Sequence, residues 1–469
     1  MFIKGRWMII GLILTMIVSS GATVVALNMT GTGPLATPGT NNATFAKLME
    51  TYNTIQQNYF QDVPTDKMVN GAIDGMIKSL DDPYSTYMDP TQAQSFHENI
   101  SSSFEGIGAQ ISEEDGKIVI ESPIKGSPAE KAGLRPKDRI LSVDGKDLQG
   151  MKSSEAVTFI RGKKGSKAEL VIERPGETGT MNVTVVRDTI PQETVYSEMR
   201  SDGIGKIRIS QFSEPTGDDF AKALTDLQGK GMKGLILDLR QNPGGLLSVA
   251  VDIGNRLIPD QKLILQVEYR DGKKEVYRSK HGKAEFPIVV LVDDGSASAA
   301  EILAGALKES GNYPLVGTKT FGKGTVQTTE EFNDGSNIKY TTAKWLTPDG
   351  NWIHKKGIEP DDKVEMPAYA NLPYIDPEKE LKLDTFSNDV KAVQQYLEAL
   401  GYHPGRTDGY FDAKTKEAVV AFQRVQNLEA NGIVKGKTTT TMIDLLRQKI
   451  EKNDTQLDKA EQVLRKMLP

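Results

Sequence analysis

Apolar runs alternate with segments of helical periodicity between residues 203 and 365. Short, continuous apolar runs are typical of strands buried on both faces, and apolar residues at three- and four-residue steps are typical of helices that cover a sheet. The pattern predicts strands over 204–212, 234–239, 263–267 and 288–292, and helices over 218–227 and 246–257. This order predicts an open α/β layer within 177–365, in which functional groups lie on loops at strand ends.

The chain before this layer begins with an apolar run and continues with a helical pattern. Residues 1–27 carry Lys4 and Arg6 ahead of the apolar run, which predicts an export signal that is either cleaved or retained as a single-pass anchor. Residues 28–42 are rich in Gly, Thr, Pro and Asn, as linkers are. Over 43–98 the apolar residues recur at helical steps, so we expect a helical arm. Because of the predicted export signal, we expect the rest of the chain to lie outside the cytoplasm.

A glycine-bearing loop marks the start of the next segment, residues 99–176. The segment contains Phe104-Glu-Gly-Ile-Gly-Ala109, Gly126-Ser-Pro-Ala-Glu-Lys-Ala-Gly-Leu134 and Asp138-Arg-Ile-Leu-Ser-Val-Asp-Gly145. With these residues it resembles a PDZ domain. The resemblance implies that backbone amides of Gly106, Ile107 and Gly108 bind the C-terminal carboxylate of a substrate, while the neighbouring strand pairs with the peptide. On the residues of the loop alone, the alternative is that Gly106-Ile-Gly108 forms only a tight turn.

One charged residue, Arg161, follows the helix expected over 153–160. A cation at this end of a helix is favourable by itself because it complements the helix dipole. The alternative is a regulatory role, in which Arg161 links this domain to the rest of the chain.

The C-terminal part of the chain predicts a small helical module. A proline-bearing linker over 366–384 leads to helical patterns within 385–450, separated by Asp408-Gly-Tyr-Phe-Asp412. These patterns resemble a peptidoglycan-binding module, for which glycan binding and a structural or dimer-forming role both remain open. The final segment, 451–469, has an apolar stripe on a charged helix, which predicts docking onto the body of the protein or onto a second subunit.

The amino-acid composition excludes several kinds of catalytic and binding site. The 469 residues carry a net charge of −6, which gives no reason to expect nucleic acid as a partner. There is no cysteine, so disulfides, thiol catalysis and thiolate metal ligands are excluded. The four histidines, His97, His281, His354 and His403, are far apart in sequence and match no metal-binding spacing. We therefore expect neither a metal site nor a cofactor.

Candidate catalytic residues lie where the strand over 288–292 turns into a helix. Ser298 stands at the start of that helix, where backbone amides can stabilise an oxyanion, although a serine there is also a common helix N-cap. Lys323 follows between two glycines, and Gln327 comes four residues later. A lysine can deprotonate a serine only if its pKa is lowered, chiefly by burial. Upstream, the glycines of Asn242-Pro-Gly-Gly245 have amides that are free to face an oxyanion.

These motifs together resemble the C-terminal processing peptidases, serine proteases with a Ser-Lys-Gln site. The resemblance covers about residues 43–365, and the C-terminal module points to the bacterial envelope and sporulation type of that family. It implies Ser298 as nucleophile, Lys323 as general base and Gln327 as the residue that orients Lys323. The implied oxyanion donors are the amides of Ala299 and of Gly244 or Gly245. Ala300 departs from the pattern, since a third serine is common there, but that position is not catalytic.

The resemblance also fixes the expected architecture: a multidomain α/β and α+β protein with a helical arm, a PDZ domain, an open α/β protease core and a small C-terminal helical module. It implies that the arm forms a homodimer, whereas the residues alone are equally compatible with a helical cap. Expected partners are protein substrates in the cell envelope, bound through their C-termini, and peptidoglycan. Two rivals remain: a Ser-His-Asp protease with an attached PDZ domain, and a non-catalytic envelope scaffold.

Overall fold

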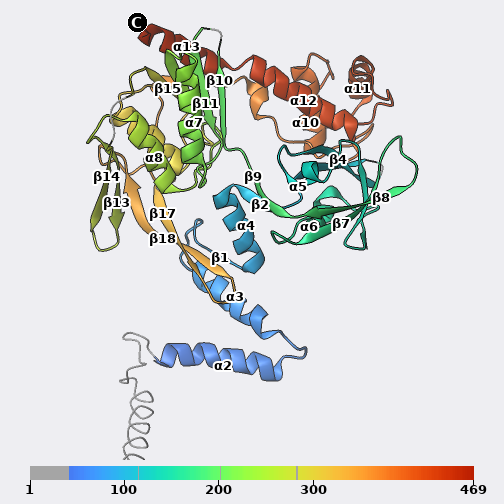
Figure 1. The fold of residues 1–469 in the computed structure, drawn as a ribbon, viewed down its shortest axis with the longest axis horizontal. Coiled ribbons are helices and arrows are strands. Elements are labelled where there is room, and N and C mark those ends of the chain that lie inside the picture. Colours follow the sequence, from blue (N-terminus) through green and yellow to red (C-terminus); the bar gives the residue numbers. More distant parts are fainter. Residues whose placement is uncertain (1–41, 115, 201, 281–283, 469) are drawn as a thin grey trace, which may run out of the picture. The chain divides into compact units, whose positions relative to one another are not determined.

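The structure, a computed structural model, describes residues 42–114, 116–200, 202–280 and 284–468 (Figure 1). It divides into two compact units: residues up to Asp89 with Ile338–Tyr340, and residues 90–337 with those from Thr341 onward. The predicted signal or anchor, and all of the predicted linker except Asn42, lie outside the described ranges. Within those ranges, no helix has both the length and the apolar character that crossing a bilayer requires.

The first unit contains two helices and a short strand: α2 (Asn42–Asn58), α3 (Thr65–Lys78) and β1 (Thr86–Met88). The helical arm expected from the periodicity is therefore present. Several of its large apolar side chains are exposed in the single chain, namely Phe45, Leu48, Met49, Ile55, Tyr59, Phe60, Val69, Met76 and Leu80. Exposed apolar surface of this kind is typical of a helix that packs against another chain. Dimer formation through this arm stays a prediction.

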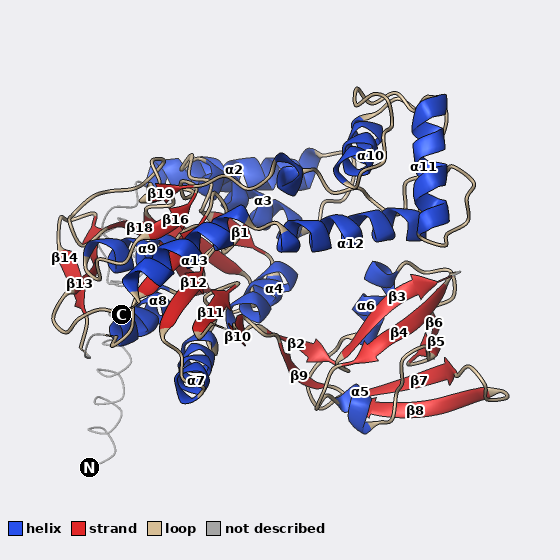
Figure 2. Cartoon of the chain, turned by 90° about the horizontal axis from the view of Figure 1, so that it is seen from above, coloured by secondary structure: helices blue, strands red, loops and turns tan. Residues whose placement is uncertain are grey.

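A six-stranded antiparallel sheet follows in the second unit. Its strands are β3 (Ala109–Glu114), β4 (Lys117–Pro123), β5 (Arg139–Val143), β6 (Lys146–Asp147), β7 (Lys167–Glu173) and β8 (Thr180–Val186). The helices α5 (Pro128–Lys131) and α6 (Ser153–Ile160) accompany it (Figure 2), and one apolar core joins both helices to the sheet. Strand β3 lies at an edge of the sheet. The sheet continues past residue 176, because β8 pairs with β7 along its whole length.

A two-stranded ribbon and one helix flank this sheet in sequence. Helix α4 (Pro90–Ser101) precedes β2 (Ser103–Gly106), which pairs in antiparallel register with β9 (Asp188–Pro191). The loop that was expected to bind a carboxylate begins within β2 and ends at the first residue of β3.

The α/β layer is a six-stranded sheet in the order β10-β11-β12-β15-β16-β19. Its strands are β10 (Val195–Met199), β11 (Ile204–Ile209), β12 (Gly234–Asp238), β15 (Ile288–Val292), β16 (Leu315–Gly317) and β19 (Asp362–Lys363). All neighbouring pairs are parallel except β10 with β11. The carboxyl ends of parallel strands meet at one edge, which is where an open α/β sheet places its functional loops.

Both faces of this sheet are buried because alternate side chains point to opposite sides. On one face Leu235, Leu237, Val290 and Val292 pack in a core with α7 (Thr216–Gly229), α8 (Leu247–Leu257) and α9 (Ala299–Glu309). On the other face Ile204, Ile236, Val289, Leu291 and Val316 pack with Leu457, Ala460 and Leu464 of α13 (Thr455–Met467). Of the two partners expected for the apolar stripe of the tail, the structure shows the body of the protein.

The prediction that the strand over 263–267 belongs to the α/β layer is wrong. This strand, β13 (Leu263–Tyr269), lies in a second sheet with β14 (Lys274–Arg278), β17 (Thr325–Glu331) and β18 (Asn337–Leu346). It pairs in antiparallel register with β18, with Val267 opposite Trp345. Its apolar run is buried by α8 and α9 rather than by neighbours in the parallel sheet.

The C-terminal module consists of a short 3₁₀ helix, η1 (Ala368–Asn371), and the helices α10 (Asn388–Ala399), α11 (Ala413–Val425) and α12 (Lys437–Lys452). Side chains Ser387 and Asp412 cap α10 and α11 through hydrogen bonds to backbone amides. Apolar side chains of α10 and α11, among them Val390, Val393, Leu397, Val419 and Phe422, lie in its buried core. The predicted multidomain architecture is thus confirmed.

Candidate active site

The carboxyl ends of β12 and β15 bring two functional loops together. Leu237 and Asp238 lie opposite Val290 and Leu291 in parallel register. The loops that follow are joined by hydrogen bonds: the amide of Ala297 donates to the carbonyl of Asn242 (2.9 Å), and the hydroxyl of Ser296 donates to the carbonyl of Leu239 (2.8 Å). The Asn-Pro-Gly-Gly loop and the serine loop therefore form one braced surface.

Ser298 occupies the position that the sequence predicted, directly before α9. Its backbone has φ 56° and ψ −115°, a conformation that costs a residue with a side chain on the order of 1–3 kcal/mol and that clusters at functional sites. The side chain is half-buried. Strain of this kind, held in place by the surrounding loops, distinguishes Ser298 from an ordinary N-cap serine, whose backbone is extended.

The candidate oxyanion donors lie against the serine. A Cβ atom built on Gly244 would be 2.8 Å from the Cβ of Ser298 and 3.0 Å from the nitrogen of Ala299, so only glycine fits there. The amide of Gly244 donates to Oδ1 of Asn242 (2.9 Å). Among the described residues, the amides of Ala299 and Gly245 donate to no backbone carbonyl. The sequence left Gly244 and Gly245 open, and this geometry favours Gly245.

Lys323 lies on the loop after β16, between two glycines at which no larger residue would fit. A Cβ on Gly322 would lie 2.9 Å from the nitrogen of Gly357, and one on Gly324 would lie 2.8 Å from the nitrogen of His354. The lysine side chain is half-buried. Gln327, on β17, donates through Nε2 to the hydroxyls of Thr325 (3.0 Å) and Thr341 (3.1 Å). An orienting role toward Lys323 stays a prediction.

A buried carboxylate that the sequence analysis did not single out connects these loops. Glu301, on α9, is fully buried and accepts hydrogen bonds from the backbone amides of Ser298 (3.0 Å) and Lys323 (2.8 Å). It also accepts from the amide of Gly322 (2.7 Å) and the hydroxyl of Thr320 (2.6 Å). Four donors satisfy both oxygens, as a buried carboxylate requires. The signal in the sequence was a glutamate three residues after the serine, the spacing of a capping box.

Two indole rings hold the lysine loop from the other side. Nε1 of Trp345, in β18, donates to the carbonyl of Lys323 (2.9 Å), and Nε1 of Trp352 donates to the carbonyl of Gly324 (2.8 Å). Trp345 is almost completely buried. Both bonds restrain the backbone on either side of the lysine.

Of the three residues expected to bind a carboxylate, Gly106 lies in β2 opposite Asp188 of β9, whereas Ile107 and Gly108 lie between β2 and β3. Among the described residues, the amides of Ile107 and Gly108 have no backbone acceptor, while their carbonyls accept from Ala129 and Ile124 (2.8 and 2.9 Å). Gly108 has φ 76°, and a Cβ there would lie 2.5 Å from the Cβ of Ser127. The loop thus combines a glycine-dependent turn with free donors beside the edge strand β3.

Arg161 contacts both the candidate carboxylate-binding loop and helix α4. It forms an ion pair with Glu98 of α4 (3.0 Å), and its guanidinium lies 4.7 Å from the centre of the Phe104 ring. Within the described ranges, no group of three or more histidine, aspartate or glutamate side chains is arranged to hold a metal ion.

Comparison with known proteins assigns the regions of the chain. The sequence profile of peptidase family S41 matches residues 203–364, and that of the PDZ domain matches 98–173. The profile of the activating protease CtpB N-terminal domain matches 24–92, and that of a putative peptidoglycan binding domain matches 386–442.

Several curated proteins are similar over nearly the whole chain. The carboxy-terminal processing protease CtpA of Bacillus subtilis (strain 168) is 50% identical over 455 residues, 97% of this chain and 97% of its own. The carboxy-terminal processing protease CtpB of the same organism is 47% identical over 421 residues, 88% of each chain. A probable CtpA-like serine protease of Staphylococcus aureus (strain MRSA252) is 38% identical over 464 residues, 98% of this chain and 93% of its own.

The α/β core with the profile of family S41, the attached PDZ domain and the similar curated proteases define a serine-type endopeptidase. The chain belongs to peptidase family S41, among the carboxy-terminal processing proteases. The non-catalytic scaffold is therefore not supported, and the resemblance that the sequence motifs indicated is confirmed.

Proposed function

We propose that Ser298 is the nucleophile and Lys323 the general base of this protease. The observation that carries the proposal is the buried carboxylate of Glu301, which accepts hydrogen bonds from the backbone amides of both residues. One side chain thereby sets the distance between two loops that are separate in sequence. Fixed placement of nucleophile and base is what the proton transfer needs.

In the proposed reaction, neutral Lys323 takes the proton of the Ser298 hydroxyl as the oxygen attacks the scissile carbonyl. The carbonyl oxygen becomes an oxyanion held by the amides of Ala299 and Gly245. Protonated Lys323 then gives its proton to the leaving amine, and a water molecule hydrolyses the acyl-enzyme. Gln327, whose Nε2 donates to Thr325 and Thr341, is the residue we propose to orient the base; its amide is neutral, so it adds no charge that would raise the pKa of the lysine.

The PDZ domain receives the substrate. We infer that the C-terminal carboxylate of an exported or membrane protein binds the amides of Ile107 and Gly108, and that the peptide pairs with the open edge of β3. Arg161 stacks on Phe104 beside this loop and pairs with Glu98, so peptide binding there can change an ion pair outside the PDZ sheet. This contact supports a regulatory role for Arg161 in proteolytic signalling.

The remaining regions support a location in the cell envelope. The apolar run over 1–27 supports export, with the segment cleaved or kept as an anchor. The exposed apolar side chains of α2 and α3 support a homodimer, and the C-terminal profile supports contact with peptidoglycan.

The test of the catalytic pair is turnover of a peptide with a free carboxylate by Ser298→Ala, Lys323→Ala and Lys323→Arg proteins. All three should lose at least roughly a thousandfold in kcat. Arginine should fail like alanine because it remains protonated and cannot act as a base. Near-parental turnover by Lys323→Arg would contradict the assignment.

A further inference from the structure

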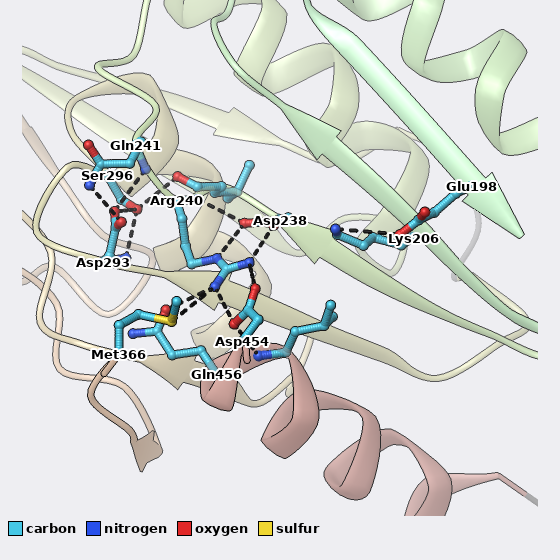
Figure 3. Close-up of polar contacts among 12 residues, drawn as sticks. Glu198, Lys206, Asp238, Arg240, Gln241, Asp293, Ser296, Met366, Asp454 and Gln456 are labelled. Atoms are coloured by element: carbon cyan, nitrogen blue, oxygen red, sulfur yellow. Dashed lines mark hydrogen bonds and ion pairs between the residues drawn. The ribbon is translucent and has the colours of Figure 1, made fainter. Parts of the chain in front are cut away.

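An arginine at the end of β12 connects the C-terminal helix to the active-site loops (Figure 3). The guanidinium of Arg240 bonds both carboxylate oxygens of Asp238 (2.9 and 2.8 Å) and both of Asp454 (2.8 Å each). It also donates to Oε1 of Gln456 (3.1 Å). The side chains of Arg240 and Asp454 are each only 13% exposed, so these charge-assisted bonds are weakly screened.

Asp454 is also the residue that starts α13. Its Oδ1 accepts from the amide of Leu457 (2.9 Å), which caps the helix, and Nε2 of Gln456 donates to the carbonyl of Val364 directly after β19 (2.9 Å). Burial alone would raise the pKa of Asp454, but the hydrogen bonds and charge of Arg240 outweigh it and hold that pKa below its ordinary value. The helix N-terminus is thus fixed to the sheet edge by an ionised pair.

The loop that continues from Arg240 leads directly to the oxyanion donors. Gln241, with φ 54°, donates two hydrogen bonds to the carboxylate of Asp293, one from its backbone amide (2.9 Å) and one from its side-chain Nε2 (2.8 Å). The carbonyl of Asn242 accepts from Ala297, and Gly244 then lies against Ser298. Arg240, Gln241, Asn242 and Gly244 each make hydrogen bonds that restrain this loop, so a shift at the arginine has few ways to relax before it reaches the glycines.

We propose that Arg240 is a positioning residue for the oxyanion loop and that Asp454 of the C-terminal helix holds it in place. The proposal rests on the proposed function, in which Gly245 and Ala299 stabilise the oxyanion. It assigns α13 a part in catalysis beyond covering the sheet, because the helix supplies the carboxylate that fixes the start of the loop.

A matched pair of variants separates positioning from stability. Asp454→Asn keeps a side chain that caps helices as well as aspartate does, but it removes the charge that holds Arg240. Lys459→Gln is the control: it breaks another ion pair of the same helix, with Asp362 of β19 (2.8 Å), and leaves Arg240 untouched. Arg240→Lys is a second variant, since lysine keeps the charge but cannot bond two carboxylates bidentately.

The readout is kcat, KM and the affinity of a peptide aldehyde. In the adduct, Ser298 Oγ bonds the aldehyde carbon, its proton passes to Lys323, and the aldehyde oxygen becomes the oxyanion. Asp454→Asn and Arg240→Lys should lower kcat and aldehyde affinity together by roughly tenfold, with KM changed less than about twofold. Lys459→Gln should match the parent in all three.

Parental kcat and aldehyde affinity in both Asp454→Asn and Arg240→Lys would overturn the proposal and leave the pair as a structural contact. A fall in melting temperature with unchanged kcat would do the same. If the parent forms no adduct, or forms one that survives Ser298→Ala, the proposed function itself fails, and this inference fails with it.

Discussion

Two sites of this protein carry backbone amides for which the described residues show no backbone acceptor, and the two sites differ in how they are held. The loop at Ile107 and Gly108 lies beside an edge strand and the partly exposed pair of Phe104 and Arg161. The loops at Gly245 and Ala299 are braced by the buried carboxylate of Glu301 and the nearly buried guanidinium of Arg240. A terminal carboxylate carries its charge before it binds, so a simple nest of amides suffices. An oxyanion exists only briefly, so its donors must be in place beforehand.

The largest expected effect comes from removing the brace at Glu301. Glu301→Gln replaces one acceptor oxygen by a donor that faces hydrogen-bond donors in a buried place, so kcat should fall by roughly a hundredfold or more. Glu309→Gln is the control, because Glu309 lies on the same helix and its carboxylate accepts from the amide of Asp349, away from Ser298 and Lys323. Steady-state kinetics of both proteins measure the effect. Equal kcat in the two variants would mean that the bracing is not needed.

The second effect concerns the open loop. Peptides with a small apolar C-terminal residue and a free carboxylate should be cut roughly tenfold faster than the same peptides amidated, because charge-assisted hydrogen bonds are lost with the amide. Gly108→Ala should abolish that preference, since the new Cβ would clash with Ser127. Gly126→Ala, which has a similar backbone but open space around it, should keep the preference. Equal cleavage of acid and amide by the parent would show that this loop is only a turn.

A third effect is a pH dependence of stability at the braced loop. The pKa of Asp454 in the folded protein lies below the ordinary value of 3.8, so its contribution to stability is present above that value and is lost as pH falls through the lowered pKa. The melting temperature of the parent should therefore exceed that of Asp454→Asn near pH 6. The difference should shrink as pH falls below about 3.8. A difference that stays constant down to acid pH would show that the charge of Asp454 is not responsible.

The smallest effect is expected at histidine. The ring of His354 stacks on Trp352 with centroids 5.2 Å apart, near the lysine loop. If Lys323 is the base, His354→Ala and His281→Ala should keep turnover within about twofold of the parent. Chelators should likewise leave turnover unchanged. A large loss in either variant would revive a Ser-His-Asp mechanism, and loss with a chelator that zinc restores would reveal a metal site.

Much of the fold and of the candidate site could be predicted from local patterns in the sequence. Strands of a parallel sheet that are buried on both faces have continuous apolar sequences, and this pattern predicted β12 and β15. The loops after these two strands contain the glycines and the serine of the recognised motifs. The helical stripe of the tail likewise predicted its packing. In each case the prediction depends on residues that are neighbours in the sequence.

Features that depend on distant pairing could not be predicted. The run of β13 fits a parallel sheet as well as it fits its observed partner, which lies near residue 345. Arg240 and Asp454 are separated by 214 positions, so no local pattern connects them. Our proposal of Gly245 rather than Gly244 as an oxyanion donor depends on the side chain of Asn242, whose Oδ1 accepts a hydrogen bond from the amide of Gly244. Only the folded chain decides such contacts.

The most direct test of the central claim is covalent labelling of the native serine. A fluorophosphonate, which reacts with activated serine hydroxyls, should add to the parent enzyme, and peptide mapping by mass spectrometry should place the adduct on Ser298. Labelling should be lost in Ser298→Ala and should be reduced at least roughly a hundredfold in rate in Lys323→Arg, since arginine cannot take the proton. An adduct on another serine, or an unchanged labelling rate in Lys323→Arg, would contradict the assignment of Ser298 and Lys323 as the catalytic pair.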